Sequence, residues 1–315
     1  MKTTQEFKDF FNKSLKTDLE NLDKRRKQMV NRFLITLFAI FIPSLAVFIL
    51  TELYIGIAFS VGVFLLLFFF WVRDKLFLNE FKQQVINRIV YFVSPDLTYD
   101  PKGHISLSEF VTSRIFMKSV DRHNGADLVY GKIDKTEFRF SEFKAEYKTT
   151  KTNSKGRTNT QWHTLFRGLF FIADFNKDFV GSTVVLPNSS GRESGFMKNV
   201  MSITRREKFV NLEDEEFSKE FTVYSDDQIN ARYILSTSLM TRIKDFKSKH
   251  KNSVYISFVD SRMYLGISHT KDLFEPRYLK SLNRFDVVKD YFDDLLLAAG
   301  IVENLNRNTR IWNNH

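Results

Sequence analysis

Apolar residues run almost without interruption from Phe33 to Val72, and the run is broken at the pair Thr51–Glu52, which holds its only charged residue. A helix needs about 20 apolar residues to cross the hydrocarbon of a bilayer, because lipid offers no hydrogen-bond partner to an exposed backbone. The run therefore predicts two membrane helices, Phe33–Leu50 and Leu53–Val72, joined by a short turn. A buried hairpin in a soluble core is the alternative, but a core helix rarely excludes Lys and Arg from every face over such a length.

Basic residues flank this apolar run on both sides, and the turn between the two spans has none. They are Lys24, Arg25, Arg26, Lys27 and Arg32 before the run and Arg73, Lys75, Lys82 and Arg88 after it. By the positive-inside rule, this arrangement predicts that both termini lie in the cytoplasm. The absence of cysteine agrees with a reducing compartment.

The segments on either side of the run have the spacing of amphipathic helices. The repeating apolar positions are Phe7, Phe11, Leu15, Leu19 and Leu22 in the first arm and Phe77, Phe81, Val85 and Ile89 in the second. We expect the two arms to pack antiparallel against each other. Alternatively, the first arm lies flat on the lipid headgroups, since its apolar face is rich in phenylalanine and its end is basic.

Ser94–Pro95 ends the second arm, and the spacing of Ser106 and Glu109 predicts a capping box that opens a short helix reaching about Met117. From Asp127 onwards the apolar period is that of strands. The apolar residues fall on even positions just before and at Phe140 and on odd positions from Phe143, which predicts a bulge near Ser141–Glu142.

Trp162–Phe175 has apolar residues on both faces and predicts a central strand. The turn at Asn176–Asp178 then predicts that Ser182–Leu186 returns as the next strand. Phe221–Tyr224 predicts a further short strand.

The carboxyl-terminal part alternates helix and strand signals. Asp226 or Asp227 can cap a helix that is broken near Ser236–Ser238, and its expected buried face carries Ile229, Tyr233, Leu239, Ile243 and Phe246. Two alternating runs around Asp260–Ser261 predict a hairpin. A last helix is expected from about Phe285 to Leu305, with a buried stripe of Val288, Phe292, Leu295, Leu296 and Ala299.

The whole pattern predicts an α+β protein: a two-helix transmembrane hairpin with helical arms, followed by a cytoplasmic domain of mainly antiparallel sheet plus helices. The expected divisions are an amphipathic N-terminal helical arm (1–32), the transmembrane helical hairpin (33–72), a juxtamembrane helix and linker (73–125), and the cytoplasmic α+β domain with its C-terminal helix (126–315).

The formal net charge of +10 raises the question of nucleic-acid binding. Much of the excess flanks the apolar run, where basic residues attract anionic headgroups by about 1 kcal/mol each, so nucleic acid is the weaker explanation. A polar stretch, Thr149–Thr160, predicts a solvated loop. Its cationic residues, together with those before the first span, are the candidates for contact with lipid or an acidic partner: Lys151, Lys155, Arg157, Lys24, Arg25, Arg26 and Lys27.

Motifs for catalysis or metal binding fail on spacing. Ser141 and Lys144 lie on a predicted strand, where positions i and i+3 face opposite sides. Asp174-x-Asn176-x-Asp178 lacks the glycine and glutamate of a calcium loop. The six histidines show no paired spacing for a metal. We therefore assign no catalytic, cofactor-binding or metal residue, and we interpret the acidic run Glu213–Glu216 as a helix start paired with Arg205–Arg206.

Several segments together resemble a family of bacterial two-pass membrane proteins catalogued only as a domain of unknown function. They are Gly125–Lys132, Phe140–Glu142, Trp162–Lys177, Val210–Glu213 and Phe221–Asp227. The resemblance implies a bacterial inner (cytoplasmic) membrane protein with a cytoplasmic domain, and it implies no active site.

Three functional hypotheses follow. The first is a membrane-anchored cytoplasmic binding or scaffold module whose partners are the bilayer and a further protein. The second is an oligomerising membrane effector, a homo-oligomer whose soluble domain senses a signal. The third is a membrane-associated hydrolase whose active site is drawn from distant residues that the sequence does not reveal.

Overall fold

The computed structural model describes residues 2–50, 62–63, 75–133, 136–152, 158–175, 178–188, 207–249, 252–270, 273–276 and 280–306. The chain divides into two compact units, unit 1 (Met1–Phe92 with Phe274–Asp294) and unit 2 (Val93–Leu273 with Leu295–His315). The second expected membrane span, Leu53–Val72, lies outside the described residues except for Gly62 and Val63.

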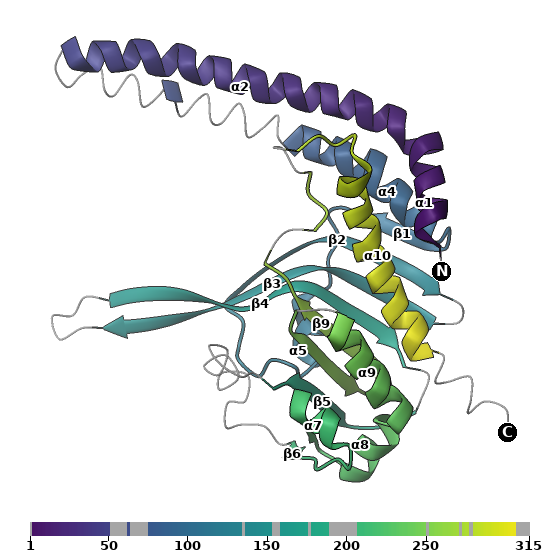
Figure 1. The fold of residues 1–315 in the computed structure, drawn as a ribbon. Helices are drawn as coiled ribbons and strands as arrows, with labels where there is room; N and C mark the ends of the chain where they lie inside the picture. Colours follow the sequence, from purple (N-terminus) through teal and green to yellow (C-terminus); the bar gives the residue numbers. More distant parts are fainter. Residues whose placement is uncertain are drawn as a thin grey trace. The chain divides into compact units, whose positions relative to one another are not determined.

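Unit 1 begins with a continuous helical arm that is drawn in purple and blue in Figure 1. It comprises α1 (Thr4–Phe10), the π-helical turn η1 (Phe11–Leu15) and α2 (Lys16–Leu50). Thr3 and Glu6 form a capping box at its start, which satisfies free backbone N–H groups of the first turn. The first expected span is therefore the second half of α2 and not a separate helix. Within the described residues, no helix is both long and apolar enough to cross a membrane.

The second arm returns along the first. It comprises helical residues 75–81, the π-helical turn η2 (Lys82–Ile86) and α4 (Asn87–Val93), which ends before Ser94–Pro95 as predicted. Arg25 pairs with Glu80 at 2.6 Å, and Arg88 donates to the Ser14 carbonyl at 3.1 Å and pairs with Asp18. Early residues of one arm thus face late residues of the other, which confirms antiparallel packing.

The apolar stripes predicted for both arms are buried, with every member at most 6% exposed. The first part of α10 (Phe285–Asn306) completes this core. The Phe7 ring stacks on Phe292 with centroids 4.0 Å apart, and the Phe10 ring stacks on Phe92 at 4.3 Å. Because its apolar face is covered in this way, the first arm is not free to lie flat on headgroups, and that alternative is wrong.

In unit 2, nine strands among the described residues form one sheet in the order β1-β2-β3-β4-β9-β8-β5-β7-β6, and all neighbours are antiparallel. The strands are β1 (Leu97–Asp100), β2 (Arg122–Ile133), β3 (Thr136–Thr152), β4 (Thr158–Asp174), β5 (Ser182–Pro187), β6 (Lys208–Phe209), β7 (Phe221–Ser225), β8 (Val254–Val259) and β9 (Arg262–Ser268). The chain is therefore α+β with a large antiparallel sheet, as predicted.

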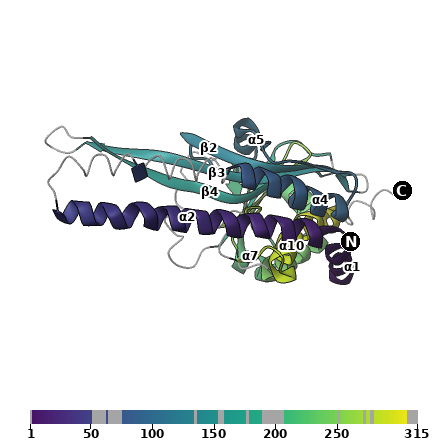
Figure 2. The same cartoon turned by 90° about the horizontal axis from the view of Figure 1, so that it is seen from above.

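Short helices cover the two faces of this sheet (Figure 2). Helix α5 (Leu107–Thr112) opens with the predicted capping box of Ser106 and Glu109 and packs Phe110 on Phe143, with ring centroids 4.6 Å apart. The face that carries Phe143 is called the α5 face below. On the opposite face, Phe217 of α7 (Glu215–Glu220) stacks on Phe221 at 5.0 Å.

Two further helices follow β7. Helix α8 (Gln228–Ile234) is capped by Asp227, as expected, and the break near Ser236–Ser238 separates it from α9 (Thr237–Lys249). Leu239 and Ile243 are buried as predicted, but Ile229 and Tyr233 are 78% and 53% exposed. Their burial was predicted wrongly because the break turns α8 out of phase with α9.

Strand irregularities also differ in part from expectation. The alternation of buried and less buried residues in β3 does shift at Phe140–Ser141, as predicted. The extra residue of the bulge, however, lies in the neighbouring strand, where Asp127 and Leu128 of β2 stand opposite Ser141. A bulge supplies such an extra residue. Asp127 takes a left-handed backbone, with φ 62°.

Strand β5 does not return beside β4. It pairs with β8 and β7, while β4 takes β9 as its neighbour. The hairpin of β8 and β9 around Asp260–Ser261 forms as predicted. The acidic run begins α7, with Asp214 as its N-cap. Lys244 pairs with this run, since its Nζ lies 3.0 Å from an Asp214 oxygen, whereas Arg205–Arg206 lie outside the described residues.

The polar stretch expected to be a loop is largely strand. β3 continues to Thr152 and β4 begins at Thr158, so residues 147–152 and 158–163 pair with each other beyond the ends of β2 and β9 (Figure 1). Threonine favours strand geometry, which explains the extension. We call this two-stranded extension the β-arm.

Replacing Phe7 with Ala should lower the free energy of unfolding by about 3 to 5 kcal/mol, because it leaves a cavity in the aromatic core of unit 1. Thermal and denaturant unfolding of the full chain measures the loss. Phe209→Ala is the matched control, since Phe209 is 58% exposed; equal losses for the two variants would contradict this description of the core.

Candidate functional site

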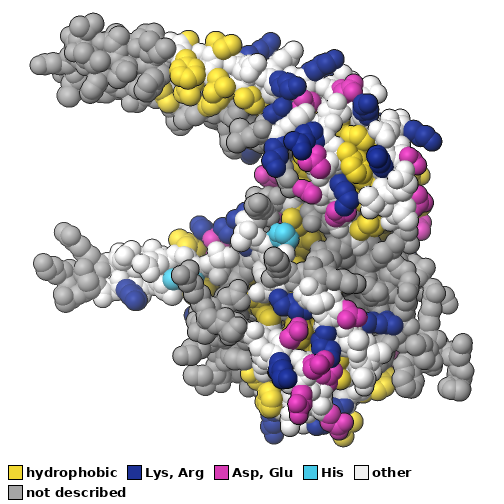
Figure 3. All heavy atoms as spheres, viewed as in Figure 1, with side chains coloured by type: hydrophobic (Ala, Val, Ile, Leu, Met, Phe, Trp, Pro, Cys, Tyr) yellow, Lys and Arg dark blue, Asp and Glu magenta, His cyan; other side chains and the backbone are white. Residues whose placement is uncertain are grey.

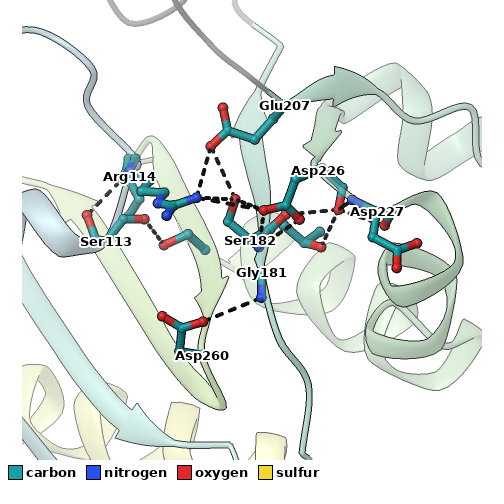
Figure 4. A network of polar contacts seen from close by, with 12 residues as sticks. Ser113, Arg114, Gly181, Ser182, Glu207, Asp226, Asp227 and Asp260 are labelled. Carbon is teal, nitrogen blue, oxygen red and sulfur yellow. Dashed lines mark hydrogen bonds and ion pairs between the residues drawn. The ribbon is translucent and has the colours of Figure 1, made fainter.

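Polar residues gather at one end of the α5 face of unit 2. Helix α5 ends at Ser113, and the next residue, Arg114, takes a left-handed backbone with φ 54°. That conformation is strained for a residue with a side chain. Ser257 holds the turn by donating to the Ser113 carbonyl at 2.5 Å, so the guanidinium of Arg114 can point along the sheet toward β5 (Figure 4).

Arg114 meets three side chains from segments far apart in the sequence (Figure 4). Its guanidinium donates to the Ser182 hydroxyl at 3.1 Å and lies 3.7 Å from Asp226 and 3.9 Å from Glu207. Ser182 Oγ stands 3.2 Å from Glu207 Oε1 and 3.1 Å from Asp226 Oδ2. The backbone N–H of Ser182 donates to Asp226 at 2.9 Å. We call these four residues the Arg114 network.

The Arg114 network is short of hydrogen-bond donors. A serine hydroxyl has one proton, so Ser182 can donate to only one of the two carboxylates at a time. The Glu207 side chain is 3% exposed, and its Oε2 is buried without a hydrogen-bond partner in the described structure. Two carboxylates facing one guanidinium also leave a net negative charge.

This geometry braces four segments of the chain. Arg114 donates to the Ser182 oxygen, and the Ser182 hydroxyl in turn faces Glu207 and Asp226. The network joins the end of α5, the start of β5, the residue before β6 and the end of β7. Sequence spacing could not reveal it, because no local motif links Arg114 with Glu207; only the Asp226–Asp227 helix start was a visible signal.

A pocket of about 390 Å³ opens on the same face of unit 2. It is lined by Tyr130, Gly131, Lys132, Glu137, Phe138, Arg139, Ile172, Ala173, Asp174 and Arg262. Glu109 of α5 pairs with Arg139 beside it. Burial opposes ionisation of Glu109, but hydrogen bonds from Ser106 and the charges of Arg139 and Arg262 outweigh it and lower the pKa of that carboxyl.

A second polar pair is fully enclosed. The Tyr99 hydroxyl of β1 donates to Asp127 at the β2 bulge, and both residues are at most 8% exposed. Burial, reinforced by the Asp127 charge, raises the pKa of Tyr99 far above its ordinary value. Tyr99 therefore stays protonated and serves as the donor that Asp127 needs.

The cations proposed from the sequence have different surroundings. Lys151 lies exposed on the β-arm opposite Asn159, while Lys155 and Arg157 lie outside the described residues. In unit 1, Lys24 is exposed, Arg25 pairs with Glu80, and Lys27 pairs with Asp23 at 3.1 Å.

Arg26 departs from the prediction. Its side chain is 9% exposed and its Nε donates to Asp23 at 2.9 Å, so it belongs to the core of unit 1 and not to a lipid-facing surface. Helical periodicity explains this, since Arg26 lies four residues after Leu22 on the buried stripe.

The structure brings together two histidines that the sequence left apart. The rings of His104 and His123 have centroids 6.0 Å apart, and both residues are exposed. Among the described residues, no group of three His, Cys, Asp or Glu side chains is placed to hold a metal ion. Ser141 accepts a hydrogen bond from the Ile105 backbone at 3.0 Å.

A protein-family model matches the part of the chain that begins within β4. Residues 164–307 match the model of a family described as "Protein of unknown function (DUF3137)". This part of the chain carries a domain of unknown function. The DUF3137 match includes Ser182, Glu207, Asp226 and Arg262 and begins after Arg114 and Arg139.

No curated protein matches the chain. The crystal structure of the mycobacterial trehalose monomycolate transport factor A, TtfA, is similar over 67% of this chain and 94% of its own length, at 12% identity and a TM-score of 0.34. That TM-score is too low to assign a shared fold.

Asp23 makes the stability of unit 1 depend on pH. Burial opposes ionisation, but hydrogen bonds from the Leu282 backbone, Lys27 and Arg26 outweigh it and lower the pKa of Asp23 to about 2. A carboxyl with a lowered pKa stabilises the fold above its unfolded pKa near 4 and loses that contribution as the pH falls toward 2. The loss should reach about 2 to 3 kcal/mol.

Denaturant unfolding between pH 6 and about pH 2 tests this. Asp23→Asn should remove that part of the pH dependence, whereas Asp293→Asn, at a more exposed ion pair, should keep it. Identical pH profiles for the wild type and Asp23→Asn would show that Asp23 is not the group responsible.

Arg114→Met should destabilise unit 2 by about 1 to 3 kcal/mol, because it leaves the buried Glu207 carboxylate facing Asp226 without a cation. Adding Glu207→Gln should recover much of the loss, since the amide is neutral and supplies donors. Thermal unfolding of the two single variants and the double variant gives the coupling. Additive effects would contradict the Arg114 network.

Proposed function

We propose that this protein is a membrane-anchored binding module. The hairpin of residues 33–72 crosses the inner membrane of a bacterium twice, and both units lie on the cytoplasmic side. Unit 1 is the platform from which the anchor extends, and unit 2 carries the binding surfaces.

The observation that carries the proposal is a change of exposure along α2. Leu19 and Leu22 are buried against the rest of unit 1, whereas Leu34, Ile35 and Phe38 are 42%, 68% and 56% exposed. Figure 3 shows a group of hydrophobic side chains on the helical arm, beyond a group of Lys and Arg side chains. Water does not favour three large apolar side chains on adjoining turns of one helix.

The chain sequence supports lipid as the occupant of this surface. The exposed apolar residues begin directly after Arg32 and belong to the apolar run to Val72, which Thr51 and Glu52 interrupt. The basic residues Lys24, Arg25 and Lys27 precede them at headgroup distance along the helix, where cations are favoured. The β-arm adds Lys151, and the sequence adds Lys155 and Arg157, as a further cationic surface for an acidic partner or anionic lipid.

A binding role agrees with the polar features of unit 2. The Arg114 network braces the sheet, and the pocket offers charged side chains without a positioned nucleophile and base among its lining residues. This arrangement supports recognition of a ligand better than hydrolysis.

Alkaline extraction of bacterial membranes that contain the full chain tests the anchor. The wild type should stay in the membrane pellet, because both spans must leave lipid for extraction to succeed. Phe41→Arg combined with Val63→Arg places one charge near the middle of each span, at a cost of about 2.5 to 3.5 kcal/mol each, and should move the protein to the supernatant.

Phe41→Leu combined with Val63→Leu is the matched control and should remain in the pellet. A tag at the carboxyl terminus should survive protease added outside spheroplasts. Extraction of the wild type into the supernatant, or removal of the tag, would overturn the proposed anchoring.

A further inference from the structure

The pocket on the α5 face carries both signs of charge within a small volume. Its lining includes the cations Lys132, Arg139 and Arg262 and the anions Glu137 and Asp174. A volume of about 390 Å³ lies at the small end of the range for small-molecule sites. All of these residues belong to unit 2.

Some of these charges are already neutralised. Lys132 pairs with Glu137 at 2.8 Å, and Arg139 pairs with Glu109. Glu109 keeps its other oxygen for the Ser106 backbone and hydroxyl, so it belongs to the α5 cap and not to a ligand. Arg139 retains further N–H groups, because a guanidinium has five donors.

Asp174 and Arg262 are the informative pair. They stand opposite each other in the β4–β9 register, yet they form no ion pair with each other. Burial raises the pKa of Tyr264 and the nearby charge of Arg262 opposes that rise, while the same charge helps to lower the pKa of Glu109. Asp174 interacts with Lys132 only through charge, at longer range. Asp174 and Arg262 thus line the pocket as neighbours on adjacent strands, and no described ion pair joins them.

We propose that this pocket binds a small zwitterion that carries an acidic oxyanion group and a primary ammonium group. Arg139 and Arg262 receive the oxyanion, since guanidinium donors match carboxylate and phosphate oxygens. Asp174 receives the ammonium. The ring of Tyr130, which is 44% exposed, covers one side of the ligand.

Ligands with one sign of charge fit this lining less well. A simple anion would meet Asp174 and Glu137, and a simple cation would meet two arginines. Repulsion of the wrong partner is as much a source of specificity as attraction of the right one. Because both signs of charge line the pocket, it favours a ligand that carries both groups.

The zwitterion can be free in solution or can be the headgroup of a lipid, and both share this chemistry. This proposal names a ligand class for the binding module proposed above. It rests on the proposed function only in assuming that unit 2 binds a ligand. Binding in detergent solution does not require the hairpin to cross a membrane, so the two proposals can fail separately.

Isothermal titration of the full chain in detergent with O-phosphoethanolamine tests the proposal. O-Phosphoethanolamine should bind on the order of 10-fold more tightly than glycerol 1-phosphate, which lacks the ammonium, and than ethanolamine, which lacks the oxyanion. Arg262→Gln and Asp174→Asn should each weaken binding by about 10-fold or more. Arg284→Gln, at a surface ion pair of unit 1, is the matched control and should bind like the wild type.

Asp174 lies exposed at the end of β4, so Asp174→Asn is the variant expected to fold normally, and a thermal unfolding curve verifies this. Equal affinity for glycerol 1-phosphate, an unchanged affinity of Asp174→Asn, or no heat with any of the three compounds would each overturn the proposal. Competition by phosphatidylethanolamine in mixed micelles would assign the lipid headgroup as the source, and its absence would assign a free zwitterion; either supports the pocket.

Discussion

Burial of phenylalanine rings from three distant parts of the chain is the interaction on which this structure depends. Phe7, Phe81 and Phe292 are almost fully buried in unit 1, although unit 2 separates the last of them from the others in sequence. The chain must therefore leave unit 1, build the sheet and return before this core closes. Asp23 reinforces the closure by accepting a hydrogen bond from the Leu282 backbone at 2.9 Å.

Helix α2, which contributes Leu19 and Leu22 to this core, also carries the first span of the proposed anchor. Leu19 and Leu22 find protein partners, whereas Leu34, Ile35 and Phe38 lie exposed. In the proposed anchoring, the basic residues between the two groups lie at the level of the lipid headgroups. A single rigid helix would thus transmit the position of the membrane to the platform.

Local signals made much of the fold predictable. Capping residues at Ser106 and Asp227, and the turn at Asp260–Ser261, act on neighbouring backbone, so the sequence alone located those elements. The partner of β5 depends on pairing between distant strands, which no local pattern encodes. The exposure of Ile229 was missed because it depends on where a helix breaks.

The candidate site was not predictable for the same reason. Arg114, Ser182 and Glu207 each occur in an ordinary local context, and the sheet alone brings them together. Arg26 was mispredicted for a local reason. The basic cluster predicted a surface position, but its place on the helix directs the Arg26 side chain into the core.

The chain has no cysteine, so a spin label on one introduced cysteine reports one position. The measurement that tests the anchor most directly is the collision rate of a label at Phe38→Cys in reconstituted vesicles with oxygen, which enters lipid, and with a water-soluble nickel chelate. The account predicts high oxygen and low nickel access at this position, and the reverse for a label at Ile229→Cys on α8, which is 78% exposed. Nickel access at Phe38→Cys equal to that at Ile229→Cys would contradict it.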